Sequence, residues 1–139
     1  MPKVAPYLTF DGNCADAMRF YERTLGGKLE MIMTHAQSPM AAQAPPGSAN
    51  LVLHVRLLID GRVLMACNAT LDEPYEAMKG VAIALNYPTA TEARRAFDAL
   101  AEAGEVRVQL QPTYHAEAFG KLVDRYGTSW MIGGGPLNT

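Results

Sequence analysis

An internal repeat at a constant spacing constrains the fold of this sequence more than any other feature. Similar residues recur 77 positions apart: Leu8 with Leu85, Phe10 with Tyr87, Phe20 with Phe97 and Gly27 with Gly104. Farther along, Gly61 and Met65 recur as Gly127 and Met131, 66 positions apart. The 11 positions lost between the two spacings correspond to a Pro-, Ala- and Gln-rich stretch, residues 35–50, in the first copy only. A period this long predicts two fused modules rather than a solenoid.

The composition is that of an ordinary globular domain. The chain has 139 residues, 49% of them hydrophobic and 19% charged, so its length suits one domain. A net charge of −2 builds no field that would attract nucleic acid or an anionic membrane, and neither is expected as a partner. The sequence has no apolar run of ~20 residues that could cross a bilayer. Its N-terminus lacks a signal-peptide core, and its two cysteines form no CxxC pair, so we predict a cytoplasmic protein.

The first module, about residues 4–67, shows one helix among strands. Asn13, with Asp16 three positions later, is typical of a helix N-cap, and Gly26 and Gly27 end the helix. Asp60-Gly61 between two apolar runs is a strong hairpin signal. The expected elements are a strand over 4–10, a helix from 13 to 26, a strand over 28–34, a long flexible loop over 35–50 and two strands over 51–67.

The second module, about residues 80–133, repeats this order. Thr89 and Glu92 form a capping box for its helix, which should end at Gly104. Strands are expected at VAIALNY before the helix and at EVRVQLQ, FGKLVDR and GTSWMIG after it. The predicted fold is therefore α+β, with two βαβββ modules. A tandem ferredoxin-like barrel competes with it but needs only two strands after each helix, which the hairpin at Asp60-Gly61 disfavours.

Strand alternation sorts the side chains into two sets, one for each face of a sheet. The set expected to pack on the helices comprises Leu8, Phe10, Val55, Leu57, Leu64, Ile83, Leu85, Trp130 and Ile132. The opposite set comprises Ala5, Tyr7, Thr9, His54, Arg56, Met65, Cys67, Ala82, Ala84, Asn86, Ser129 and Met131. This second set mixes small, polar and thioether side chains, which suits a pocket lining better than a core.

The opening YLTFDGNCADAMRFYERTLGG and the closing FGKLVDRYGTSWMI, on this paired architecture, resemble the vicinal oxygen chelate superfamily, which contains glyoxalase I and the bleomycin resistance proteins. More narrowly, they resemble its PhnB-like branch. The resemblance covers residues 5 to 133. It implies two modules that form a U-shaped mixed sheet around a cavity with the helices outside, and a homodimer. Some members of the branch carry a methyltransferase label, but the chain shows no Gly-rich cofactor loop.

The resemblance also bears on metal binding. Metal-dependent members place a His, Gln or Glu ligand on the first and last strands of each module. Matching their motifs to this chain assigns these positions to Ala5, Met65, Ala82 and Met131, and the repeat spacings of 77 and 66 agree. None of the four side chains supplies the donors that a hard or borderline divalent cation needs. We therefore expect no metal at these positions and no cofactor.

Other residues are candidates for a site in the cavity. His54 and Arg56 lie two apart on one strand, so both face one side, where they either bind an anionic group or turn to solvent. Tyr114 and His115 lie in a loop and either contact a ligand or are surface residues. A relocated metal site would require His54, His115 and Glu117 to converge. The predicted ligand-binding residues are Tyr7, Thr9, His54, Arg56, Met65, Cys67, Asn86, Tyr114, His115 and Met131.

Cys14 and the methionines each have two interpretations. Cys14 lies in the first turn of the first helix, where the helix dipole lowers a thiol pKa, although a buried inert thiol is the more common outcome. Met65 and Met131 either line the cavity or fill the core.

Three functions are compatible with these residues. The first is a metal-free protein that binds a small, partly apolar molecule, as the bleomycin resistance relatives do by sequestration. The second is an enzyme of the same superfamily, an isomerase, lyase or dioxygenase, with a shifted metal or with His54 as a general base and Arg56 holding an anionic substrate. The third is a dimeric interaction module without a ligand.

Overall fold

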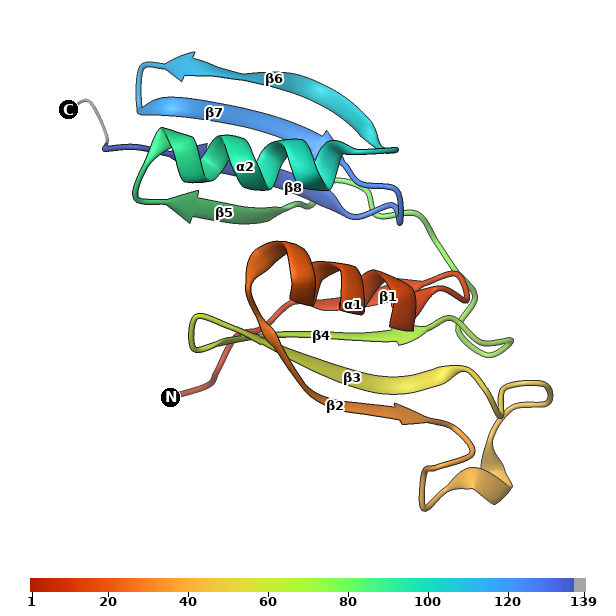
Figure 1. Cartoon of the computed structure of the whole chain (residues 1–139). Helices are drawn as coiled ribbons and strands as arrows, with labels where there is room; N and C mark the ends of the chain where they lie inside the picture. The colour runs from red at the N-terminus through yellow and green to blue at the C-terminus, as the bar shows by residue number, and fades with distance from the viewer. Residues whose placement is uncertain (137–139) are drawn as a thin grey trace. The chain divides into compact units, whose positions relative to one another are not determined.

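A computed structural model of the protein describes residues 1–136. The chain divides into two compact units, Met1–Glu76 and a second unit that begins at Ala77. Each unit contains one α-helix and one four-stranded sheet, and in each the helix covers one face of its own sheet (Figure 1). Three strands follow each helix, so the βαβββ prediction is confirmed and the ferredoxin-like alternative is wrong.

The first unit follows the predicted order closely, except that its first strand begins at Tyr7 rather than residue 4. Its elements are β1 (Tyr7–Phe10), α1 (Cys14–Leu25), β2 (Lys28–Thr34), the 3₁₀ helix η1 (Ala41–Gln43), β3 (Val52–Ile59) and β4 (Arg62–Asn68). The strand order is β1-β4-β3-β2, in which β1 pairs with β4 in parallel and the other pairs are antiparallel. Because β3 and β4 are the inner strands, the alternation of their side chains determines which residues lie on each face of the sheet.

The second unit repeats that topology. Its elements are β5 (Ile83–Tyr87), α2 (Ala90–Ala101), β6 (Glu105–Thr113), β7 (Ala116–Val123) and β8 (Ser129–Gly134). The strand order is β5-β8-β7-β6, again with one parallel pair, β5 with β8. The last strand continues one residue past the predicted end of the module at 133.

Strand register confirms the repeat that the sequence shows. Tyr7 lies opposite Met65 in the first sheet, and Ala84 lies opposite Met131 in the second. The spacing between Tyr7 and Ala84 is 84 − 7 = 77, and that between Met65 and Met131 is 131 − 65 = 66. Both spacings inferred from sequence are thus spacings between equivalent positions of the two parallel pairs.

The core of each unit lies between its helix and one face of its sheet. Most of the predicted helix-facing set is buried there: Leu8, Phe10, Val55, Leu57, Leu64, Trp130 and Ile132. Ile83 and Leu85 are only half-buried, because β5 is an edge strand of the second sheet. In α1 the residues Ala17, Phe20 and Tyr21 face the core, and in α2 the corresponding stripe is Ala93, Ala96, Phe97 and Leu100.

The two helices begin in different ways. Thr89 caps α2 as predicted: its hydroxyl oxygen accepts a hydrogen bond from the Glu92 backbone N–H (3.1 Å). The prediction that the Asn13 side chain caps α1 is wrong, because that side chain makes no capping hydrogen bond. Instead the Asn68 side chain, at the end of β4, accepts a hydrogen bond from the Cys14 N–H (3.0 Å). The cap of α1 therefore comes from a strand 54 residues away.

Close backbone approaches explain two of the repeated glycines. A Cβ atom at Gly27 would lie 2.8 Å from the Leu58 carbonyl oxygen, closer than real Cβ contacts allow. A Cβ atom at Gly104 would likewise meet the carbonyl oxygen of Val123. Both glycines follow a helix, and the absence of a side chain lets the backbone pack against the last residues of a strand in the same sheet.

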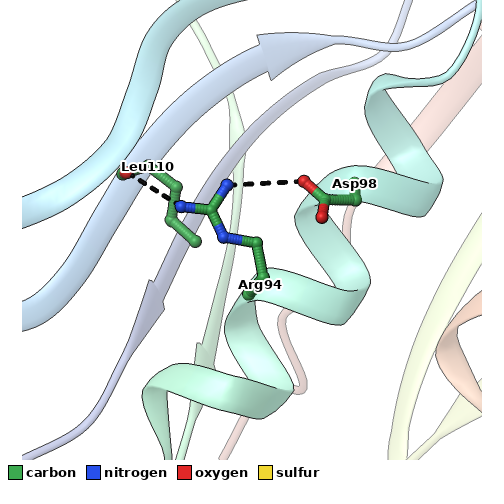
Figure 2. Close-up of polar contacts among 3 residues, drawn as sticks. All are labelled: Arg94, Asp98 and Leu110. Carbon is green, nitrogen blue, oxygen red and sulfur yellow. Dashed lines mark hydrogen bonds and ion pairs between the residues drawn. The ribbon is translucent and has the colours of Figure 1, made fainter.

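A side-chain contact ties α2 to the edge strand β6. The Arg94 guanidinium donates a hydrogen bond to the Leu110 carbonyl oxygen (3.2 Å) and pairs with Asp98 at 3.5 Å (Figure 2). Pairing between β6 and β7 shifts register between Val108 and Gln111, so Leu110 lies in an irregular stretch of the ladder. Arg94 thus satisfies a carbonyl that lies in this irregularity.

The segment 35–50 contains more structure than a loop prediction implies. Its two ends are joined by backbone hydrogen bonds from His35 to Leu51 and from Ala36 to Ala49, both 3.0 Å long. His35 and Ser48 are buried, and η1 lies between them. The flexibility of the segment and the assembly of the two units into one U-shaped domain stay predictions. Among residues 1–136, no helix is long and apolar enough to cross a membrane.

The hairpins of the two units differ in how their aspartates act. Asp60 and Gly61 both have positive φ (46° and 76°), the conformation of a two-residue type I′ turn, so the predicted hairpin is confirmed. In the second unit Asp124 is buried. Its carboxylate accepts hydrogen bonds from the Tyr126 and Thr128 N–H groups (2.8 and 3.1 Å) and from the Trp130 indole (2.8 Å). The DRYGTSW motif therefore builds a turn.

Candidate functional site

The face of the first sheet that α1 does not cover carries six of the predicted site residues. Tyr7 and Thr9 of β1 lie opposite Met65 and Cys67 of β4, and Met65 in turn lies opposite Arg56 of β3. His54 shares the face of Arg56 because it lies two residues earlier on the same strand. We call this surface the open face of the first sheet. All six side chains are half-buried or exposed, whereas their strand neighbours Leu8, Val55 and Ala66 are buried.

Tyr7 and His54 form the best-defined contact on the open face. The Tyr7 hydroxyl lies 3.1 Å from His54 Nδ1, at hydrogen-bond distance, and the two rings are stacked with centroids 5.7 Å apart. Partial burial raises the pKa of Tyr7 to about 12, and the neighbouring Cys67 adds to the effect. The phenol therefore stays protonated at neutral pH, and the contact fixes the orientation of the imidazole while its other nitrogen, Nε2, is left for another partner.

Arg56 lies on the same face and has weak partners among the described residues. Its Nε atom is 3.8 Å from Glu30 Oε1, and both side chains are 41% exposed. Its Nη1 atom is 3.9 Å from the Met65 sulfur, a weak acceptor. An ion pair this long and this exposed contributes little to stability, so an incoming anion could take Glu30's place at low cost.

The two cysteines lie in different environments. Cys67 is half-buried on the open face, with its sulfur 4.0 Å from the Thr9 hydroxyl. Cys14 is fully buried, and this burial, followed by the charge of Cys67, raises its thiol pKa from 9.0 to about 12. The expectation that the helix dipole lowers the pKa of Cys14 is wrong, because the cost of desolvating a thiolate exceeds the benefit of the dipole. Burial of Cys14 fits the inert-thiol alternative.

The remaining predicted site residues belong to the second unit. Asn86 of β5 and Met131 of β8 share the uncovered face of the second sheet, because Ala84 pairs with Met131 and Asn86 with Gly133. Tyr114 and His115 occupy the turn between β6 and β7. Tyr114 is 88% exposed, while the His115 ring packs between Tyr114 (4.8 Å) and Phe119 (5.1 Å). His115 Nδ1 also lies 3.1 Å from the Thr113 hydroxyl.

Sequence reasoning missed several residues on the uncovered faces. In the first sheet, Met31 lies opposite Arg56 and Met33 opposite His54, so both methionines belong to the open face. A register shift between Leu29 and Met31 obscures the alternation of β2, although the pattern Met-Ile-Met in KLEMIMT is a usable signal. In the second sheet, Phe119 and Lys121 of β7 share a face with Met131.

The four positions that the resemblance assigns to metal ligands do not suit a divalent cation. Ala5 and Ala82 precede β1 and β5 and carry no donor atom, while Met65 and Met131 offer only thioethers. Among the described residues, no group of three or more His, Cys, Asp or Glu side chains is placed to hold a metal ion. A relocated metal site at His54, His115 and Glu117 stays an untested alternative, and the absence of any metal stays a prediction.

Comparison with known proteins decides the family. Residues 2–133 match the family described as 3-demethylubiquinone-9 3-methyltransferase. The chain belongs to this family. Protein YjdN of Escherichia coli (strain K12) is 33% identical to it over 137 residues, which cover 93% of this chain and 92% of YjdN.

Two solved structures extend the family likeness to three dimensions. Protein PA1353 from Pseudomonas aeruginosa is 38% identical, with a TM-score of 0.89 over 97% of this chain and 98% of that one. A Bacillus cereus protein described as a putative 3-demethylubiquinone-9 3-methyltransferase, PhnB protein, is 22% identical, with a TM-score of 0.80 over 96% and 99% of the two chains. The resemblance to the PhnB-like branch is thereby confirmed, as is the glyoxalase/bleomycin resistance fold.

Proposed function

We propose that this family member binds a small, partly apolar molecule with an anionic group on the open face of its first sheet. Binding does not use a divalent cation at the positions that the resemblance assigns to metal ligands. The observation that carries the proposal is the Tyr7–His54–Arg56 grouping. It places an oriented imidazole and a weakly paired guanidinium on a face with accessible side chains, next to the thioether of Met65.

The charges on this face support an anionic group in the ligand. Arg56 pairs with Glu30 at 3.8 Å, and a carboxylate or phosphate could form a forked contact at shorter distance. His54 adds a second donor whose charge depends on pH. The methionines Met31, Met33 and Met65 supply flexible apolar contact for the rest of the molecule.

The test begins with metal. Chelator-stripped protein is titrated by calorimetry with Ni²⁺, Zn²⁺ and Mn²⁺, and we expect neither heat nor thermal stabilisation. Binding near one ion per chain at micromolar affinity or better would overturn the metal-free part of the proposal and direct the search toward glyoxalase or dioxygenase substrates.

The second step screens small anions with apolar groups by thermal shift, in the wild type and in Arg56→Ala. We expect a stabilising ligand whose affinity falls about tenfold or more in Arg56→Ala, since hydrogen bonds to a charged group are worth about 1.5–3 kcal/mol. The control is Arg107→Ala, which removes an exposed arginine of β6 that pairs with Glu105 at 3.4 Å. Equal losses in both variants would show a non-specific charge effect and contradict the assignment.

The Tyr7–His54 contact also favours a second candidate, an enzyme that uses His54 as a general base. Tyr7 holds Nδ1, and a general base needs a fixed imidazole with a free nitrogen. Loss of turnover in a folded His54→Ala variant, on any substrate found by the screen, would support this candidate, and unchanged turnover would remove it. Adding a methyl donor such as S-adenosylmethionine to the same assays tests the activity that the family description names.

We further propose that the protein forms a homodimer, as the superfamily resemblance implies. Light scattering coupled to size-exclusion chromatography measures the mass directly. A mass of one chain at micromolar concentration would contradict the proposal, and it would also remove the dimeric interaction module from the candidate functions.

A further inference from the structure

The open face of the first sheet gathers sulfur and imidazole groups in one row across three strands. Met33 of β2 lies opposite His54 of β3. On the next strand pair Val55 lies opposite Ala66, so their antiparallel neighbours His54 and Cys67 are adjacent on the other face. Side chains directly opposite each other in an antiparallel pair have Cβ atoms about 5 Å apart. A thioether, an imidazole and a thiol therefore lie side by side.

Tyr7 shows that two of these groups point to a common place. Its hydroxyl lies 3.1 Å from His54 Nδ1, and Cys67 is close enough to help raise the pKa of the Tyr7 phenol. The imidazole nitrogen and the thiol sulfur are thus both within reach of one small group. Because Tyr7 is 49% exposed, its ring can turn toward solvent and release that position.

We propose that His54, Cys67 and Met33 form a binding site for a soft monovalent metal ion, Cu(I). Thiolate and thioether donors select Cu(I), and imidazole also suits copper. Binding forms a bond between copper and the Cys67 sulfur as the S–H bond breaks, and the thiol proton passes to solvent. No electron is transferred, since the metal enters and remains as Cu(I).

The donor set explains why a soft ion would be chosen over a divalent one. Among the described residues, His54 and Cys67 have no third His, Cys, Asp or Glu partner, so a tetrahedral zinc site is not assembled. A thioether from Met33 adds a third donor only for a soft ion. Met65 is a poorer choice than Met33, because its sulfur lies 3.9 Å from the cationic Arg56.

Charge does not oppose this site. A Cu(I) ion on one thiolate and one neutral imidazole leaves no net charge. Arg56, a cation on the same face, is paired with Glu30 at 3.8 Å. The inference goes beyond the proposed function, because it concerns a different ligand class and is tested with a different probe. Failure of the small-molecule screen would leave it untouched, and its own failure would leave the proposed function untouched.

The experiment is an anaerobic titration of the reduced full chain with Cu(I) in competition with a chromophoric Cu(I) chelator. We expect one ion per chain. Loss of a partner that only orients a metal ligand typically costs about 10–100-fold in affinity, so Cys67→Ser and His54→Asn should each lower Cu(I) affinity more than about 100-fold, and Met33→Leu about tenfold. Two matched controls should bind as the wild type does: Cys14→Ala, which removes the buried thiol, and Met40→Leu, which removes an exposed methionine.

Wild-type affinity in folded Cys67→Ser or His54→Asn, or equal losses in Cys14→Ala, would overturn the proposal. Thermal unfolding establishes that each variant is folded. A second measurement needs no variant: X-ray absorption at the copper edge of the wild-type complex must show both sulfur and imidazole nitrogen ligands. A spectrum with sulfur alone would show binding elsewhere and would equally overturn the site.

Discussion

The two modules share a topology and a register but begin their helices by opposite means. In the second module, Thr89 and Glu92 cap α2 from within the local sequence. In the first, Asn68 reaches from β4 to the N–H of Cys14. The position equivalent to Asn68, 66 residues on, is Gly134, where even a Cβ atom would lie 2.5 Å from the Ala93 Cβ atom. In the first module β4 therefore supplies the cap of α1, whereas in the second module β8 carries a glycine that leaves room for α2.

The hairpins of the two modules also differ, because one aspartate serves a local turn and the other joins the core. Asp60 is exposed and serves a two-residue turn, whereas Asp124 is buried and accepts hydrogen bonds from the Tyr126 and Thr128 N–H groups and from the indole of the core residue Trp130. The uncovered faces differ as well. On the equivalent edge strands, the first sheet presents Tyr7 and Thr9, while the second presents Ala84 and Asn86. The repeated backbone tolerates divergence at caps, turns and the uncovered face, and keeps the glycines that close backbone contacts require.

The strongest way to break the comparison is to remove the buried aspartate. Asp124→Ala leaves the Trp130 indole and two backbone N–H groups without their acceptor. Unsatisfied buried donors cost about 1–3 kcal/mol each, so we expect a loss of about 4 kcal/mol in the free energy of unfolding. Urea denaturation of Asp124→Ala and Asp60→Ala measures the difference. Asp60→Ala should lower the free energy of unfolding by no more than about 2 kcal/mol, the cost of a left-handed conformation for alanine. Equal losses in the two variants would contradict the difference between the hairpins.

Alkaline pH should weaken the first module through Cys14. The folded thiol has a pKa of about 12 against 9.0 for the ordinary group, so it stays protonated in the folded protein after it ionises in the unfolded chain. The contribution is fully present below pH 9 and is lost as the pH rises from 9 toward 12, at up to about 1.4 kcal/mol per pH unit.

The measurement is urea denaturation between pH 8 and 11 in the wild type and Cys14→Ala, where we expect the variant to lose stability less steeply. Tyr87→Phe is the matched change in the second module, since burial also raises the pKa of Tyr87. An unchanged slope in Cys14→Ala would show that Cys14 is not the group responsible.

The helix caps should give the smallest and most informative difference. Asn68→Ala leaves a buried N–H at Cys14 without an acceptor, at a cost of about 2 kcal/mol. Thr89→Ala removes a cap that is exposed to water, which can replace the lost partner, and costs about 1 kcal/mol. Thermal unfolding of both variants, with Asn13→Ala as the control that should change little, ranks the three positions. A larger loss in Asn13→Ala than in Asn68→Ala would reverse the assignment.

Sequence alone predicted the parts of the molecule that depend on neighbours in the chain. The Asp60-Gly61 turn, the Thr89 capping box and the alternation along β3 and β4 follow from local geometry, and the repeat predicted two equivalent modules. Asn13 has a good capping sequence, yet Asn68 performs that role. The side chain of a strand end 54 residues away is invisible to local patterns.

The candidate site likewise has features that sequence predicted and features that only the tertiary structure decided. Periodicity of two placed His54 and Arg56 on one side of a strand, because successive side chains must point to opposite faces. That Tyr7 orients His54 from 47 positions away, that Met33 joins them across a register shift, and that burial raises rather than lowers the pKa of Cys14 were decided by the tertiary structure. Strand register and solvent exclusion are properties of the packed sheet, and no short stretch of sequence contains them.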